Sequence, residues 1–303
     1  MINGRSRSSR GITDIQVVLI VAIGIIASIA LVSWFLISSL LAGSFIPGSG
    51  GRLEFEESET RSATLTGEEA IIEFSNFNGR VTLIPTSGND LTVTITMVGR
   101  RSQIDNVDIS FAASLDPGGR DTVSLFVTRR TNLVGRAAEV HLEALVPADI
   151  SYDLDLSTLN GRIEVRQLHG SVLVADTLNG AIVLNDVEFD DIQAETLNGR
   201  VNGVIRAKEV KIETNIGAID VIASGGGDYD LRTQNGAISV TLRESSGIRV
   251  DATTINGRVD WIGGPAGQSP GRLVAELQGI PETETITLLL RAENGNITIQ
   301  ILR

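Results

Sequence analysis

The sequence predicts an all-β fold: a β-solenoid-like stack of ~19-residue strand–turn–strand repeats, preceded by one transmembrane α-helix. Asn-Gly pairs at a nearly fixed interval predict the repeats, and apolar residues at every second position beside each pair predict the strands. A long uncharged run near the N-terminus predicts the helix. The expected parts are a basic cytoplasmic tail or leader (1–14), the transmembrane helix (15–42), a linker (43–52) and an extracytoplasmic β-repeat domain (53–303), with regular repeats at 150–303.

Composition restricts the chemistry that the chain can perform. It has 303 residues and no cysteine, so disulfides and thiolate metal sites are excluded. Two histidines, His141 and His169, leave little material for an imidazole metal site, and we expect no cofactor. The net charge of −12 argues against nucleic acid as a partner, because phosphate binding needs clustered cations.

The N-terminal helix is predicted from Ile15–Leu41, 27 residues of which none is charged. As a helix, such a run spans about 40 Å, more than the hydrocarbon core of a bilayer. Arg5, Arg7 and Arg10 precede it, so the positive-inside rule places the N-terminus in the cytoplasm and the β-repeat domain outside. We therefore expect a single-pass protein of the cell membrane whose residues 15–42 contact lipid.

Two other interpretations of this segment stay open. A cleaved secretory signal is one, although its apolar run is usually shorter. The other rests on the letters RGIT at 10–13, which with the apolar run resemble the class III signal of type IV pilin-like proteins, especially archaeal ones. That resemblance implies cleavage between Gly11 and Ile12 and a helix that packs into a filament core. Gln16 stands where bacterial pilins carry a glutamate.

The repeat is clearest when the chain is aligned on one recurring glycine. The aligned glycines are Gly161, Gly180, Gly199, Gly217, Gly236 and Gly257, with an early copy at Gly79 and a late copy at Gly295. Successive spacings among the first six are 19, 19, 18, 19 and 21 residues, and a threonine stands three residues before each of them. If equivalent strands stack, the threonines form a ladder that can share hydroxyl hydrogen bonds. Asn-Gly suits the turn because both residues tolerate positive φ.

Other parts of the β-repeat region are less regular. Residues 53–150 are strand-like with longer excursions, and residues 263–271 form a loop that interrupts the stack. The last copy, Leu288–Ile301, has no evident cap, so its edge could pair with another chain and lead to self-association. A twisted β-sandwich of consecutive hairpins is the alternative fold.

A second resemblance rests on the segment VPADISYDLDLSTLNGRIEVRQLHGSVLVADTLNGAIVL at 146–184. Its lead-in at Pro147 and the recurring Thr-x-Asn-Gly-x-Ile/Val resemble the putative-adhesin family with β-strand repeats, a domain of unknown function, over residues 65–303. The resemblance implies a β-repeat domain behind a transmembrane helix on a bacterial or archaeal cell. Two departures are Ile216 in place of asparagine and the lack of a clear copy near residue 276.

Candidate catalytic and metal-binding chemistry is sparse. The acids that could serve a polysaccharide-cleaving β-helix enzyme fall in no repeated column, so we interpret them as strand-face and turn residues; they are Asp153, Asp155, Asp186, Asp190 and Asp191. The segment GGGDYD at 225–230 resembles a calcium-binding repeat but occurs once, so no metal site is expected. No catalytic residue is predicted.

Arginine directly follows the glycine in four copies, at Arg80, Arg162, Arg200 and Arg258. We expect these side chains along one exposed edge, where they protect the edge by charge or bind an anionic ligand.

The sequence thus favours a membrane-anchored, surface-exposed β-repeat protein with an adhesive, binding or envelope-structural role, and not an enzyme. Its expected partners are membrane lipid and an unidentified surface ligand or protein. A type IV pilin-like filament subunit, cleaved after Gly11, is the alternative. A carbohydrate-active β-helix enzyme is a weaker alternative.

Overall fold

The computed structural model describes residues 54–116, 118–130, 137–243, 247–264, 267–277 and 285–302. Residues Arg52–Arg303 form one compact unit. Apart from one four-residue helix, α2 (Arg101–Ile104), its regular structure over these ranges is all-β. The predicted leader, transmembrane helix and most of the linker lie outside the described residues. Within the described ranges, no helix has the length and apolar character needed to span a bilayer.

The strands follow the alternation that the sequence predicts. Their bounds are β1 (Phe55–Thr64), β2 (Glu69–Asn78), β3 (Val81–Thr86), β4 (Asp90–Gly99), β5 (Val107–Leu115), β6 (Asp121–Arg129), β7 (Glu139–Pro147), β8 (Ser151–Asn160), β9 (Ile163–Arg166), β10 (His169–Asn179), β11 (Ile182–Asn198), β12 (Val201–Ile216), β13 (Ile219–Ser224), β14 (Gly227–Asn235), β15 (Ile238–Arg243), β16 (Gly247–Ile262), β17 (Gln268–Leu277), β18 (Thr285–Asn294) and β19 (Ile297–Leu302). Buried and outward residues alternate along most of them, as in β4 and β14, so one face of these strands lies in the core, whereas β1 has no buried residue.

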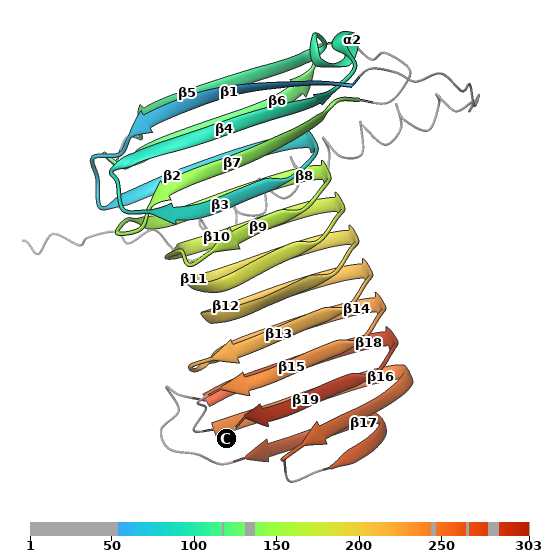
Figure 1. Ribbon diagram of the computed structural model, residues 1–303. Coiled ribbons are helices and arrows are strands. Elements are labelled where there is room, and N and C mark those ends of the chain that lie inside the picture. Colours follow the sequence, from blue (N-terminus) through green and yellow to red (C-terminus); the bar gives the residue numbers. More distant parts are fainter. Residues whose placement is uncertain are drawn as a thin grey trace, which may run out of the picture. The chain divides into compact units, whose positions relative to one another are not determined.

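The strands pair in two ladders (Figure 1). One runs β5–β6–β2–β8–β10–β11–β12–β14–β18–β16–β17. The other runs β1–β4–β7–β3–β9–β11–β12–β13–β15–β19–β16–β17. The long strands β11, β12 and β16, together with β17, belong to both ladders, so all strands form one 19-stranded sheet.

Seven strands close into a ring, which corrects the predicted fold class. The parallel pairings β12–β14–β18–β16–β19–β15–β13 return to β12, so these strands form a closed, barrel-like ring, and the other strands lie outside it. The prediction of a β-solenoid-like stack is therefore wrong. The alternative sandwich of consecutive hairpins is wrong too, because equivalent strands pair in parallel.

The order of the strands also departs from a simple stack. The last copy, β18 and β19, lies between β14 and β15 on one side and β16 on the other (dark red in Figure 1). The predicted free edge at Leu288–Ile301 is therefore wrong, since both of its sides are paired. The outermost strand at this end is β17, which pairs antiparallel with β16 and carries Pro270, a residue suited to an edge because it has no N–H to donate.

The threonine column is confirmed, but its hydrogen bonds differ from those expected. Thr158, Thr177, Thr196, Thr214 and Thr233 stand opposite one another on successive parallel strands. Their hydroxyls do not bond to one another. Each donates to the carbonyl oxygen of the aligned glycine on the neighbouring strand, as from Thr196 to Gly180 at 3.0 Å. The same bond joins Thr214 to Gly199 at 3.0 Å and Thr254 to Gly295 at 2.8 Å.

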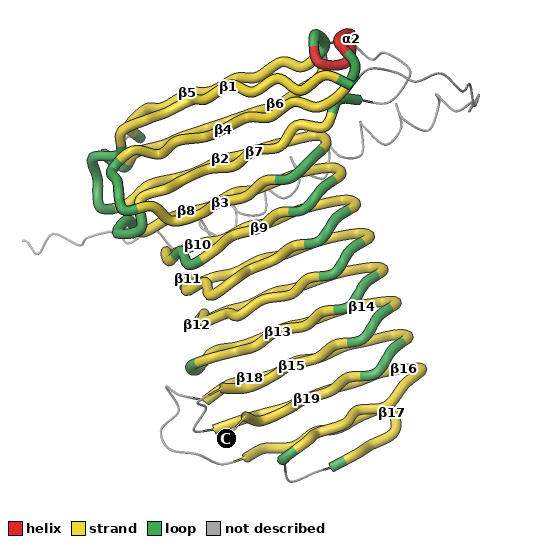
Figure 2. Tube along the Cα trace, viewed as in Figure 1, coloured by secondary structure: helices red, strands yellow, loops and turns green. Residues whose placement is uncertain are grey.

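Close approach of the backbone requires the aligned glycines, and among them Gly79, with φ of 122°, also has a backbone conformation that favours glycine. A Cβ atom built on Gly180 would lie 1.7 Å from the carbonyl oxygen of Gly161, and one on Gly217 would lie 1.8 Å from that of Gly199. Among the described residues, the only non-glycine residues with positive φ are Gln167 and Asp186, so no asparagine of an Asn-Gly pair has one. Figure 2 shows these turns as short loops repeated along one side of the strands.

The turn asparagines form a ladder of side-chain amides. Asn179 donates to Asn160 at 2.9 Å, and Asn198 donates to Asn179 at 2.8 Å. A second run joins Asn294 to Asn235 at 2.9 Å and Asn256 to Asn294 at 2.7 Å. Ile216, 54% exposed, stands opposite both Asn198 and Asn235 and separates the two runs.

The threonine–glycine bonds should contribute measurably to stability. Replacing Thr196 by the similarly shaped valine (Thr196→Val) leaves a buried carbonyl oxygen without its donor, so the free energy of unfolding should fall by about 1–2 kcal/mol. Chemical denaturation of the purified chain measures this change. Thr241→Val, on an outward position of β15, is the control and should change stability by less than about 0.5 kcal/mol. Equal effects of the two variants would contradict a role for the ladder.

Joining the two amide runs should stabilise the protein. In Ile216→Asn the new amide can donate to Asn198 and accept from Asn235, which should add about 0.5–1 kcal/mol and raise the melting temperature by about 2–4 °C. Ile255→Asn removes an isoleucine that is 72% exposed and is not in the amide ladder, so it controls for loss of apolar surface. An equal rise in both variants would show that the amide ladder is not the cause.

Candidate functional site

The four predicted arginines are exposed but do not gather into one site. Backbone hydrogen bonds order their column as Arg80, Arg162, Ala181, Arg200, Ala218, Ala237, Asn296 and Arg258. Arg80 and Arg162 are neighbours, whereas Arg200 and Arg258 are four strands apart, about 19 Å at the usual strand spacing. Arg258 Nε also lies 3.0 Å from the Asp260 carboxylate on its own strand. Of the four arginines, two are therefore close together and two are separate. The binding edge that they were predicted to form stays a prediction.

The candidate aspartates lie in different places. Asp153 on β8 is paired with Arg120, with Nη1 2.7 Å from its carboxylate, and Asp190 on β11 is paired with Lys208 at 2.7 Å. Asp153 and Asp191 share a column but are two strands apart, because Val172 stands between them in the register. Asp186 lies at the corner of β11, away from this column. The five carboxylates therefore do not converge on one point.

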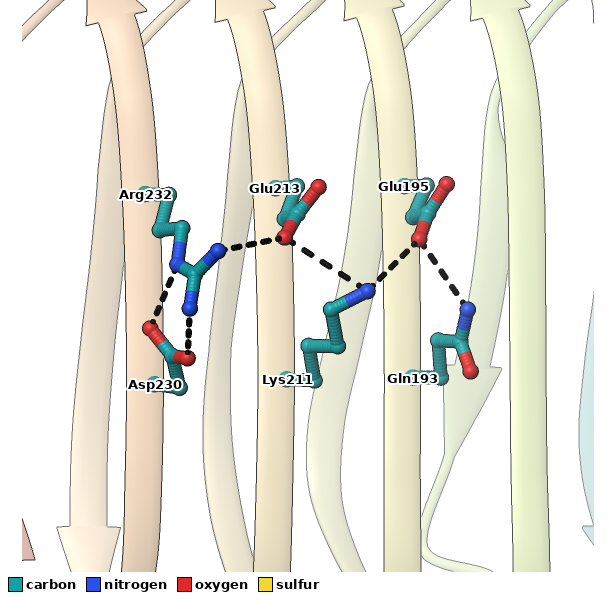
Figure 3. Close-up of polar contacts among 6 residues, drawn as sticks. All are labelled: Gln193, Glu195, Lys211, Glu213, Asp230 and Arg232. Atoms are coloured by element: carbon teal, nitrogen blue, oxygen red, sulfur yellow. Dashed lines mark hydrogen bonds and ion pairs between the residues drawn. The ribbon is translucent and has the colours of Figure 1, made fainter. Parts of the chain in front are cut away.

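The outward face of β11, β12 and β14 carries a charged network (Figure 3). Lys211 Nζ lies 3.4 Å from Glu195 and 3.5 Å from Glu213, and Arg232 Nη1 lies 3.7 Å from Glu213. Arg232 also pairs with Asp230, and Gln193 donates to Glu195 at 3.0 Å. Within this network the positive groups lie between acids on neighbouring strands. Further along the same face, Asp191, Glu209 and Asp228 stand opposite one another without a basic partner among the described residues.

Asp176 lies on the same face and is the more buried case. It is half-buried on β10 beside Glu195 of the adjacent strand, and its buried Oδ1 atom has no hydrogen-bond partner. Burial is the main cause that raises the pKa of Asp176; with the carboxylates of Glu195 and Asp155 raising it and the Lys211 ammonium lowering it, the pKa is about 7. The charged form of this side chain is therefore unfavourable in the folded protein.

A pocket of about 360 Å³ opens at the corner where β9, β10, β11, β12 and β13 meet. Its polar lining residues are Gln167, His169, Asp186, Glu188, Arg206 and Ser224. Leu168, Val187 and Ile205 also line it, and these residues are almost fully buried. The volume is at the lower end of the range for small-molecule sites.

Two strained residues shape this corner pocket. Gln167 has φ of 48° and Asp186 has φ of 58°, a left-handed conformation that is uncommon outside glycine. They are neighbours in the ladder, since the Gln167 N–H donates to the carbonyl of Asn185 at 2.8 Å. Asp186 is the extra residue where the register of β11 against β12 shifts. Strain of this kind concentrates at functional sites, which makes the corner pocket the best candidate site.

The histidines do not form a metal site. His169 lines the corner pocket, whereas the His141 Nδ1 atom accepts the backbone N–H of Arg80 at 3.2 Å in a distant part of the sheet. Over the described ranges, no three histidine, aspartate or glutamate side chains are placed to hold a metal ion.

One irregularity of the repeat in the sequence coincides with the pocket, although the repeat pattern alone did not predict a pocket there. We call the segment from one aligned glycine to the next a coil. The coil from Gly199 to Gly217 has 18 residues, one fewer than the coil on either side, and the pocket lies at its corner. Nothing in the residue types of Gln167 and Asp186 indicated left-handed backbone there.

Comparisons with known proteins place the chain among distant structural neighbours. No family model matches the sequence, and no curated protein matches it. A putative cell adhesion protein from Clostridium sporogenes ATCC 15579 is 14% identical, over 82% of this chain and 100% of that one, with a TM-score of 0.41. A putative adhesin from Bacteroides fragilis NCTC 9343 is 12% identical, over 81% and 97%, with a TM-score of 0.35. A putative lipid binding protein from Parabacteroides distasonis ATCC 8503 is 10% identical, over 81% and 97%, also with a TM-score of 0.35.

Two of these proteins carry the adhesin name that the sequence resemblance implied. Each TM-score is below 0.5, so no conclusion about this chain's activity or ligand is drawn from them.

The raised pKa of Asp176 predicts a pH-dependent stability. An acid whose pKa is higher in the folded state binds more protons there, so stability should fall as pH rises from about 4 to 7 and then level off. Asp176→Asn removes this penalty and should add on the order of 2–4 kcal/mol at pH 8, with little gain near pH 4. Denaturation curves of both proteins at several pH values measure this. Asp220→Asn, an exposed aspartate of β13, is the control; a gain for Asp176→Asn that is the same at all pH values would contradict the assignment.

Proposed function

We propose that this chain is a membrane-anchored, surface-exposed β-repeat protein with an adhesive, binding or envelope-structural role. Residues 15–42 anchor it, the N-terminus is cytoplasmic and the β-repeat unit is extracytoplasmic. The uncharged run preceded by arginines supports the anchor and its orientation. The observation that carries the binding role is the corner pocket, where Asp186, Glu188 and Arg206 line one cavity without ion pairs to other described protein groups.

A non-catalytic role is proposed because the candidate acids do not act together. Asp153 and Asp190 are each paired with a basic side chain, and Asp186 lies apart from them at the corner. General acid–base cleavage of a glycosidic bond needs two carboxyl groups on opposite sides of that bond. The proposed function therefore does not include cleavage of carbohydrates.

A second function, a type IV pilin-like filament subunit, is favoured by one specific observation. The letters RGIT at 10–13 stand directly before the apolar run, as the pilin-like resemblance requires. In that case the chain is cut between Gly11 and Ile12, and the apolar helix joins subunits instead of anchoring one chain.

The mass of the N-terminal peptide from the native membrane distinguishes these functions. The anchored protein should retain residues 1–11, remain in the membrane fraction and lose its β-repeat unit when intact cells are treated with a protease. A mature chain that begins at Ile12 would replace the proposal with the filament subunit. Protection of the β-repeat unit from protease in intact cells would contradict surface exposure in both.

A further inference from the structure

The departures from the repeat gather on one coil, the one that contains β12. Its spacing is 18 residues, and both lysines of the whole sequence, Lys208 and Lys211, lie on it. Gly203 occupies an inward position that carries Leu184 on the strand before and Val221 on the strand after. A Cβ atom on Gly203 would lie 2.4 Å from the Leu184 carbonyl oxygen, so the backbone of this coil is drawn in toward its neighbour.

The shortened coil accounts for the corner pocket. The two preceding coils turn their corners through the left-handed residues Gln167 and Asp186, and the coil of β12 has no residue at the equivalent position. The pocket lies at this interruption of the repeat and is lined by both Asp186 and Arg206.

The charged groups at the pocket have no protein partner in the part of the chain that the structure describes. Asp186, Glu188 and Arg206 are exposed, and among the described residues their side chains make no hydrogen bond or ion pair with one another or with a neighbour. On the sheet face, by contrast, Lys211 and Arg232 are bound to acids (Figure 3). The pocket thus presents acceptors and donors that are available to a ligand.

The chemistry of these groups narrows the ligand class. Two carboxylates against one guanidinium disfavour an anion, which would be repelled by Asp186 and Glu188. A metal ion is disfavoured because the described residues hold no suitable group of three ligands. Neutral hydroxyl groups can donate to the carboxylates and also accept from Arg206 and Gln167, so a polyhydroxylated molecule matches this mixed lining. A volume of about 360 Å³ has room for one such ring.

We infer that the corner pocket binds one ring of a neutral sugar, with Asp186 and Glu188 accepting its hydroxyl protons and Arg206 donating to its oxygens. This inference rests on the proposed binding role and names its ligand class. The left-handed backbone of Asp186 is strained, and such strain is typical of residues that are held in position for a ligand contact.

The test uses the full chain in detergent micelles and the methyl glycosides of glucose, galactose, mannose and N-acetylglucosamine as probes. Saturation-transfer NMR should detect at least one glycoside, with a Kd of about 1 mM from calorimetry, as expected for a ligand of this size. Asp186→Gly removes the carboxylate at a position whose φ glycine adopts readily, and it should weaken binding at least about 10-fold, the loss of one charged hydrogen bond. Arg206→Gln should weaken binding to a similar extent.

Arg200→Gln is the matched control, because this arginine is exposed on the same coil but does not line the pocket. Its Kd should equal that of the parent chain. Three results would overturn the inference: no glycoside bound at 50 mM, a Kd unchanged in both pocket variants, or binding only of a charged probe such as lysine methyl ester or inorganic phosphate. Failure here leaves the N-terminal mass and protease results unaffected, so it is distinguishable from failure of the proposed function.

Discussion

The close approach of each aligned glycine to the glycine carbonyl of the neighbouring strand is the constraint on which the structure depends. No side chain fits between them, since a Cβ atom on Gly180, Gly199 or Gly217 would overlap a carbonyl oxygen at 1.7–1.8 Å. The threonine three residues earlier bonds to the same oxygen and fixes the register. A shift of one residue would then turn every apolar side chain from the core to solvent. The apolar columns, the amide ladder and the charged face all follow from this single alignment.

A fixed register also decides where charges can be used. On a regular face, side chains at equivalent positions of neighbouring strands are held about 4.8 Å apart, so adjacent acids need a basic neighbour, a raised pKa or exposure to water. Lys211 and Arg232 are such basic neighbours, and the pKa of Asp176 is raised. Asp191, Glu209 and Asp228 stand opposite one another in exposed positions. At Asp186 the register is interrupted, and the carboxylate there lines a pocket instead of a regular face.

The sequence predicted those features that depend on near neighbours in the repeat. The threonine column and the alternation of buried residues were correct because each is set by the same short pattern in every copy. The closed ring, the antiparallel outer strands and the place of the last copy were missed, since they depend on which distant strands pair, and a period of 19 residues is the same for each arrangement. At the site, the four arginines are exposed, and Asn296 enters their column from far along the chain, a neighbour that the local repeat does not indicate. Glycine was assigned to the turn for its φ, whereas the carbonyl of another strand is what requires it.

The place of β18 and β19 has a consequence for how the protein folds during synthesis. These strands are synthesised after β16 but separate it from β14 and β15, so the ring cannot close until β19 has left the ribosome. Strands made earlier cannot take their final pairing before then, unlike an array that assembles in the order of translation.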